Sequence, residues 1–184
     1  MNSNLVIRRT PLTALAAGAM IVFTACGGQS AGDAALELIA GDLTEQLDLG
    51  ELDATCNEPD SEEAGETFTC SATTESGDVV EFVGSMVADD EIVMGASNVL
   101  LAEDFEVLEA DATEVVAANF EVEPTSVSVV CPDETTILND DQQASCEITD
   151  AADGATYELI VNMLPFSAGE GFSGAEYEVG EQIS

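Results

Sequence analysis

Residues 67–72 read Thr-Phe-Thr-Cys-Ser-Ala, and residues 143–148 read Gln-Ala-Ser-Cys-Glu-Ile. In both stretches, apolar or small side chains alternate with polar ones around a cysteine. The apolar sets are Phe68, Cys70 and Ala72 in the first stretch and Ala144, Cys146 and Ile148 in the second. A period of two residues is typical of a β-strand with one face toward the core. The two stretches therefore predict equivalent strands in a sheet with one buried face.

A second cysteine precedes each of these strands at almost the same distance. Cys56 lies 14 residues before Cys70, and Cys131 lies 15 residues before Cys146. Other alternating stretches occupy corresponding places, namely Leu52, Ala54 and Cys56 with Val127, Val129 and Cys131, and Val80, Phe82 and Met86 with Tyr157, Leu159 and Met163. Recurrence of the same elements at a fixed spacing indicates an internal repeat.

A helix is predicted before the first strand of each copy. Leu36, Ile39, Leu43 and Leu47 form one apolar stripe at helical spacing, and Gly50 suits the end of that helix. In the second copy, Asp111 followed by Glu114 is typical of a helix start, with the stripe Leu108, Ala112, Val115 and Val116. Pro124 disfavours helix in the residue before it and so marks the end.

We therefore predict an α+β fold made of two tandem repeats. Each repeat is expected to be a helix packed on a four-stranded antiparallel sheet, with hairpin turns at Gly77 and Gly154. The predicted boundaries are residues 33–104 for the first repeat and residues 105–184 for the second.

The four cysteines of the repeats allow three disulfide connectivities. The repeat favours Cys56 with Cys70 and Cys131 with Cys146, because each pair then joins neighbouring strands of one copy. Closing a loop of about 15 residues contributes roughly 3 kcal/mol by the chain-entropy argument. Free thiols or a metal site are the rival interpretation; exported thiols oxidise, and the chain has no close Cys-x-x-Cys spacing.

The N-terminus has the pattern of an export signal. Arg8 and Arg9 precede an uncharged, largely apolar run over residues 11–23, which is too short for a membrane span of about 20 residues. The ending Phe23-Thr24-Ala25-Cys26 resembles the bacterial lipobox, with Phe23 where Leu, Val or Ile is usual. We predict a lipoprotein signal peptide over residues 1–25, lipidation of Cys26, and a flexible tether over residues 26–32. In the alternative, Cys26 is an ordinary apolar residue at the end of a short anchor.

The charge pattern excludes several classes of function. The chain has 38 Asp and Glu, no Lys and no His, and its two Arg lie in the first ten residues. Without Lys or Arg the body cannot bind a phosphate backbone, so nucleic acid is excluded as a partner. Histidine bases, lysine Schiff bases and histidine metal ligands are absent from the sequence.

Two short motifs imitate enzyme signatures but lack their context. Residues 28–32 satisfy the Gly-x-Ser-x-Gly string of hydrolases, yet they lie in the predicted tether and no His exists. Residues 169–174 spell Gly-x-Gly-x-x-Gly, yet they lead into an alternating, strand-like stretch instead of a helix. Paired carboxylates could hydrolyse glycosides, but with 38 acids any pair is unremarkable and the chain has no Trp for sugar stacking. We predict no catalytic residues and no cofactor.

Three acidic clusters are the remaining chemistry: residues 58–63, 89–91 and 139–141. Oxygen-rich loops suit Ca²⁺, but no EF-hand spacing occurs and acidic hairpin loops are ordinary solvated turns. Divalent-cation binding therefore stays an alternative, and no metal ligand is predicted.

The second copy resembles the actinobacterial "domain of unknown function 4333" family. The resemblance rests on Ser128-Val129-Val130-Cys131-Pro132, on Cys146, and on residues 153–157, Asp-Gly-Ala-Thr-Tyr. The first copy departs from it, since Asn57 follows Cys56 where the family has proline. The resemblance implies a secreted or membrane-tethered module with a preceding helix and no established catalytic residues. The layout is also similar to bacterial β-lactamase inhibitor proteins, in architecture alone.

Together these patterns predict a non-enzymatic, lipid-anchored protein on the extracytoplasmic face of the cell membrane. Its paired disulfide-linked modules are expected to bind another envelope or extracellular protein, an inhibited enzyme being a special case. The alternative is a Ca²⁺-binding or cation-dependent adhesion module.

Salt is predicted to stabilise the fold, because every acid follows Gly32 and no basic side chain follows Arg9. Screening of like charges contracts from about 10 Å at 0.1 M salt to about 3 Å at 1 M. The melting temperature, followed by circular dichroism, is expected to climb steeply with NaCl. A flat response from low to molar salt would contradict the repulsion argument.

Overall fold

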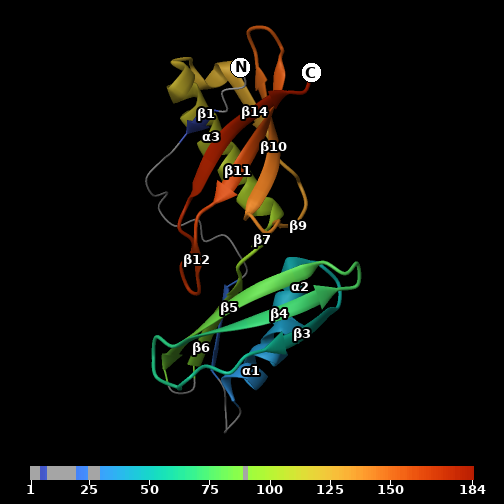
Figure 1. Cartoon of the computed structure of the whole chain (residues 1–184), viewed down its shortest axis with the longest axis vertical. Coiled ribbons are helices and arrows are strands. Elements are labelled where there is room, and N and C mark those ends of the chain that lie inside the picture. The colour runs from blue at the N-terminus through green and yellow to red at the C-terminus, as the bar shows by residue number, and fades with distance from the viewer. Residues whose placement is uncertain (1–4, 8–19, 25–29, 89–90) are drawn as a thin grey trace. The chain divides into compact units, whose positions relative to one another are not determined.

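The computed structural model describes residues 5–7, 20–24, 30–88 and 91–184, which form an α+β protein as predicted (Figure 1). By their contacts they separate into two compact units. We call residues 16–99 and 166–171 the α1 unit, and residues 1–15, 100–165 and 172–184 the α3 unit. Among the described residues, no helix is both long enough and apolar enough to cross a bilayer.

The α1 unit contains an antiparallel sheet with the strand order β2-β6-β5-β4-β3. Its strands are β2 (Met20–Thr24), β3 (Leu52–Cys56), β4 (Thr67–Thr74), β5 (Val79–Ala88) and β6 (Glu91–Ala96). The short strands β7 (Val99–Leu100), β12 (Phe166–Ser167) and β13 (Gly171–Phe172) lie at the residue boundaries of the two units, and β12 pairs with β13.

The period of two residues places the predicted side chains on the buried face. In β4, Phe68, Cys70 and Ala72 are buried, and the residues between them are exposed. Val80, Phe82 and Met86 of β5 are buried as well. The matching set in β3 is only half-buried, because β3 is the last strand of the sheet and has a neighbour on one side only.

The first helix forms over the predicted residues but contains one wide turn. It consists of α1 (Ala31–Leu38), a π-helical turn η1 (Ile39–Leu43) and α2 (Thr44–Leu47). The Thr44 hydroxyl donates to the Ile39 carbonyl across this turn (2.5 Å). A wider turn keeps residues four apart on one face, so Ile39, Leu43 and Leu47 are buried as predicted and Leu36 is only half-buried.

The end of this helix differs from the prediction. Asp48, not Gly50, takes the left-handed conformation directly after Leu47, with φ of 54°. Gly50 also has a positive φ (78°) and lies in the connection to β3. Aspartate tolerates this conformation better than most side chains, which is why glycine was not required at the cap itself.

The α3 unit contains a second antiparallel sheet, in the order β1-β14-β11-β10-β8. Its strands are β1 (Leu5–Ile7), β8 (Val127–Val130), β10 (Gln143–Asp150), β11 (Thr156–Met163) and β14 (Ala175–Gln182). The short strand β9 (Thr136–Ile137) follows β8 along the chain and is not part of this sheet. The predicted strand face is buried at Val129, Ala144, Cys146, Ile148, Leu159 and Met163.

The second helix begins earlier than predicted. Helix α3 (Ala102–Phe120) starts nine residues before Asp111, and the Asp104 carboxylate accepts the Leu101 N–H (2.8 Å) at its first turn. The predicted start at Asp111 and Glu114 is therefore wrong: both residues lie inside the helix. The predicted stripe of Leu108, Ala112, Val115 and Val116 is buried. The chain leaves the helix at Glu121, and Pro124 opens the short 3-10 turn η2 (Pro124–Ser126).

Each sheet has one strand more than predicted, and the extra strand comes from the N-terminal segment. β1 pairs with β14, with Leu5 opposite Val179 and Ile7 opposite Tyr177. β2 pairs with β6, with Met20 opposite Gly95. The export-signal pattern gave no reason to expect strands there. Their pairing follows from the open edges of β14 and β6, which accept an extended segment through the backbone alone.

Gly84 is expected to tolerate no side chain, because it lies directly opposite Phe68 in the β4–β5 pair and a Cβ there would overlap the Phe68 ring. Gly84→Ala should cost about 1–3 kcal/mol of unfolding free energy, as overpacked cores do. Gly41→Ala is the control, since a Cβ at this exposed helical position meets nothing within 4 Å. It should stabilise by up to about 1 kcal/mol. Urea denaturation measures both, and equal effects would contradict this account.

Candidate functional site

Both predicted disulfides are present. The sulfur atoms of Cys56 and Cys70 are 1.97 Å apart, and those of Cys131 and Cys146 are 1.98 Å apart. Cys56 and Cys70 stand directly opposite each other in β3 and β4. Cys131 follows β8 immediately, and Cys146 lies in the neighbouring strand β10. All four thiols are consumed within their own units, so the rival interpretation of free thiols or a cysteine metal site is wrong.

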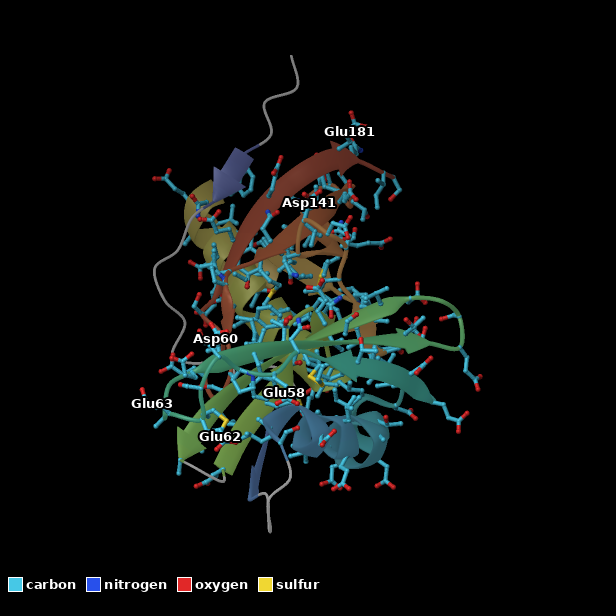
Figure 2. The ribbon with its side chains drawn as sticks, turned by 60° about the horizontal axis from the view of Figure 1, so that its bottom comes forward. Glu58, Asp60, Glu62, Glu63, Asp141 and Glu181 are labelled. Carbon is cyan, nitrogen blue, oxygen red and sulfur yellow. A yellow bond between two sulfur atoms is a disulfide. The ribbon has the colours of Figure 1, made fainter. Side chains whose placement is uncertain are left out.

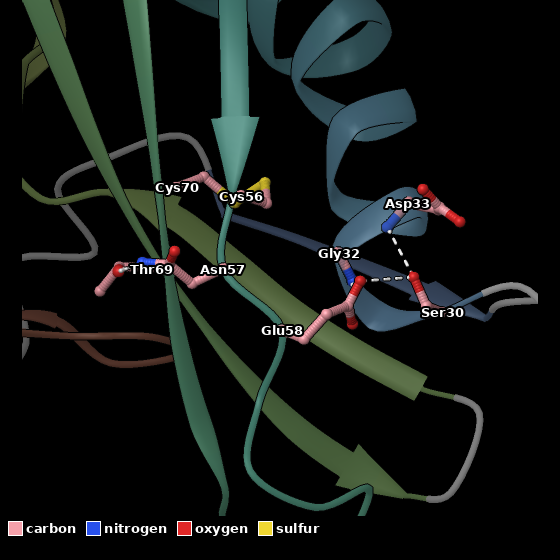
Figure 3. The surroundings of a disulfide bond; sticks show 8 residues. All are labelled: Ser30, Gly32, Asp33, Cys56, Asn57, Glu58, Thr69 and Cys70. Atoms are coloured by element: carbon pink, nitrogen blue, oxygen red, sulfur yellow. Dashed lines mark hydrogen bonds between the residues drawn. A yellow bond between two sulfur atoms is a disulfide. The ribbon is translucent and has the colours of Figure 1, made fainter.

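In the α1 unit, a carboxylate joins the disulfide region to the start of the helix (Figure 3). Glu58, two residues after Cys56, accepts the Ser30 hydroxyl (2.6 Å) and the Gly32 N–H (3.2 Å). Ser30 caps the helix and accepts the Asp33 N–H (3.2 Å). Free N–H groups and the helix dipole make a helix start favourable for a negative charge. The helix start therefore takes the place that a cation would have beside Glu58.

In the α3 unit, a helix carboxylate bonds directly to a disulfide cysteine. The half-buried Glu109 of α3 accepts the Cys131 N–H through Oε1 (2.7 Å). The bond fixes the end of β8 against the middle of the helix. Neither Glu58 nor Glu109 was predicted as a structural acid, because their partners are 22 or more residues away in sequence.

A buried acid lies deeper in the same unit. The Tyr177 hydroxyl of β14 donates to Asp111 Oδ2 of α3 (2.9 Å), and both side chains are buried. Asp111 thus links the helix to the sheet instead of beginning the helix. A buried carboxylate with a hydrogen-bond partner of this kind helps to hold the helix on the sheet.

The acidic clusters are mostly solvated. The loop between β3 and β4 carries four exposed acids, Glu58, Asp60, Glu62 and Glu63 (Figure 2). In the third cluster, Asn139 Oδ1 accepts the N–H groups of Asp141 and Gln143, which forms a turn before β10. Asp89 and Asp90 of the second cluster lie outside the described residues. Within the described ranges, no three Asp, Glu or Cys side chains gather closely enough to hold a metal ion.

The two enzyme-like motifs have structural places. Ser30, the serine of residues 28–32, is the helix cap described above. Residues 169–174 run from the β12–β13 hairpin into β14, so no helix follows them. Cys26, the predicted lipidation site, lies outside the described residues.

An apolar cavity of about 340 Å³ opens in the α3 unit, and no sequence motif predicted it. It lies where the C-terminal end of α3 meets the sheet, and its walls come from α3, β8, β10, β11 and β14 together with the chain after α3. Phe120, Val122, Ile148, Tyr157 and Val179 are among the lining residues. Phe120 is 51% exposed and Val122 is 43% exposed. In the sequence, Phe120 and Val122, which follow the predicted apolar stripe of the helix, are the residues that could have indicated the cavity.

Comparison with known proteins gives no relative: no family model, no curated protein and no solved structure matches the chain.

Loss of the Glu58 carboxylate is expected to destabilise the α1 unit. Glu58→Ala removes two hydrogen bonds and the charge at the helix start, which should cost about 1 kcal/mol. Glu62→Ala, an exposed position in the same loop, removes the same charge and should be neutral or slightly stabilising because it relieves repulsion. Chemical denaturation compares the two variants. A cost at Glu62 equal to that at Glu58 would rule out the capping role.

Proposed function

We propose that this chain is a non-enzymatic lipoprotein, anchored through Cys26 at the extracytoplasmic face of the cell membrane, whose two disulfide-linked units bind another protein. One observation carries the proposal: both cysteine pairs form disulfides inside their own units. Disulfides form and persist in oxidising compartments outside the cytosol. The fifth cysteine then stands at the end of an export-type segment, where lipid attachment gives it a role.

A non-catalytic role is supported by the side chains that the sequence offers. Carboxylates are the only abundant ionisable groups after Arg9. Three of the acids accept hydrogen bonds that link distant parts of the chain, namely Glu58, Glu109 and Asp111. Acids used in this way hold the fold and are poorly placed to transfer protons to a substrate.

We further propose that the α1 and α3 units are two copies of one helix-and-sheet module. In support, the strand orders β6-β5-β4-β3 and β14-β11-β10-β8 correspond. A disulfide links β3 to β4 in one unit, and a disulfide links the residue after β8 to β10 in the other. A helix precedes the four strands in both copies.

Protein binding is favoured by the apolar surface of the α3 unit. Phe120 and Val122 expose about half of their surface at the rim of a cavity with largely apolar walls. Exposed apolar groups clustered at a concave site are typical of interaction surfaces, whereas scattered ones are not.

Calcium binding is the second candidate. It rests on the exposed acids of the loop between β3 and β4, of which Glu58 is already bound to the helix start. Thermal denaturation in millimolar CaCl₂ is compared with thermal denaturation in MgCl₂ or NaCl of matched ionic strength. The comparison distinguishes a specific calcium site from general screening of the charges. We expect equal shifts in the melting temperature. A shift several degrees larger in CaCl₂ would replace protein binding with a cation-dependent function.

Lipid anchoring is tested by expressing the full chain and a Cys26→Ser variant in an exporting bacterial host. We expect the parent chain to partition into detergent and its N-terminal peptide to begin at residue 26 with the added mass of acyl chains. The Cys26→Ser variant should lack that mass and remain in the aqueous phase. A parent chain that retains residues 1–25 without lipid would refute the anchor.

A further inference from the structure

We propose that the outer edge of β14, together with the adjoining α3-unit cavity, binds an extended segment of a partner protein. The expected segment has two apolar residues at alternate positions, followed by a basic residue. This inference deepens the proposed function, because removal of residues 1–25 would leave that edge without its neighbouring strand.

The first support is that an extended segment already pairs at this edge. Leu5–Ile7 forms an antiparallel pair with β14, in which Leu5, Val6 and Ile7 stand opposite Val179, Glu178 and Tyr177. Among the strands of this sheet that come from residues 26–184, β14 is the edge strand on the side of β1, and β8 is the edge strand on the other side. Once β1 is removed, the edge presents unpaired backbone donors and acceptors, which are a template for another strand.

The second support is the position of the cavity. Val179 both lines the cavity and stands opposite the first residue of the added strand. Tyr177 lies two residues away on the same face of β14, where its hydroxyl bonds to Asp111 of α3. Residues directly opposite each other in an antiparallel pair point to the same face. The docked residues opposite Val179 and Tyr177 therefore face α3, and the first of them lies at the cavity.

The third support is charge. Continuing the register by one residue brings the next position of a docked segment opposite Glu176. An opposite charge directly across an antiparallel pair is favourable. The 38 acids of residues 33–184 would also attract a basic segment from a distance. Backbone pairing supplies affinity, and the cavity with Glu176 supplies the preference for apolar-x-apolar-basic sequences.

The test uses the full chain and a variant that vacates the edge without shortening it: Leu5→Ser, Val6→Gly and Ile7→Ser combined. The probe is a fluorescent peptide with the sequence of residues 2–10, Asn-Ser-Asn-Leu-Val-Ile-Arg-Arg-Thr. We expect the vacated variant to bind it at least tenfold more tightly than the parent chain, where the tethered segment competes at high effective concentration. Anisotropy in 0.3 M NaCl measures binding under conditions that suppress non-specific attraction.

Two peptide controls separate strand pairing from charge. A peptide with Val6→Pro should lose binding, because proline cannot donate to the ladder and resists pairing within a sheet. A peptide of the same composition with its residues reordered should also fail. Equal binding of the reordered peptide, or equal binding of the probe by parent and vacated chains, would overturn the proposal.

The cavity is tested by Phe120→Ser in the vacated variant, with Val107→Ser as the matched control. Both residues are on α3, and their exposed fractions are similar at 51% and 47%, but only Phe120 lines the cavity. Phe120→Ser should weaken probe binding by tenfold or more, and Val107→Ser by less than twofold. Thermal melts confirm that each variant folds.

The outcomes for the edge and for the anchor are independent. Because these chains keep residues 1–25, probe binding does not depend on removal of the signal peptide or on lipidation. The Cys26→Ser experiment tests those two steps separately. A folded vacated variant that fails to bind the probe refutes the edge site and leaves the lipoprotein proposal standing.

Discussion

Repulsion among carboxylates is the constraint to which the rest of this structure responds. After Arg9 the chain has no cation with which an acid could pair. Acids therefore accept hydrogen bonds from uncharged donors. Glu58 accepts at a helix start, Asp104 accepts from the backbone at another, and Glu109 accepts from the cysteine N–H. Backbone N–H groups and helix dipoles do the work that salt bridges do in other proteins. This arrangement favours helix starts and strand ends as the places where acids are useful.

The disulfides have a corresponding role in cohesion. Each unit is small, and a small core buries little apolar surface, so it gives a highly charged chain only a small free energy of unfolding. The disulfide between β3 and β4 and the disulfide between the end of β8 and β10 each lie beside a helix–carboxylate contact. Salt screening, disulfide formation and core packing therefore all contribute to the free energy of unfolding. When one of them is weakened, the fold depends more strongly on the other two.

The fold class, the buried strand faces and the disulfide pairing could be predicted because they depend on the local period of apolar residues and on the similar spacing of the two cysteine pairs. The burial of Phe68, Cys70 and Ala72 could be predicted from the alternation of apolar and polar residues alone. The start of α3 could not be predicted in this way, because Asp111 and Glu114 imitate a cap and the side chain that begins the helix is Asp104. The cavity and the bonds of Glu58 and Glu109 depend on residues far apart in sequence. The pairings of Leu5–Ile7 and Met20–Thr24 were missed because both segments lie within the predicted export signal, which carries no strand prediction.

The short span of each disulfide also bears on how the protein acquires its structure. Both bridges join residues 14 or 15 positions apart, and the first pair lies wholly before the second in the chain. Local contacts close quickly, whereas distant ones wait for much of the chain. Under the export proposed above, a chain that emerges N-terminus first can form the Cys56–Cys70 bond before Cys131 is delivered. Vectorial emergence would thus protect the native connectivity from the two scrambled ones, without help from an isomerase.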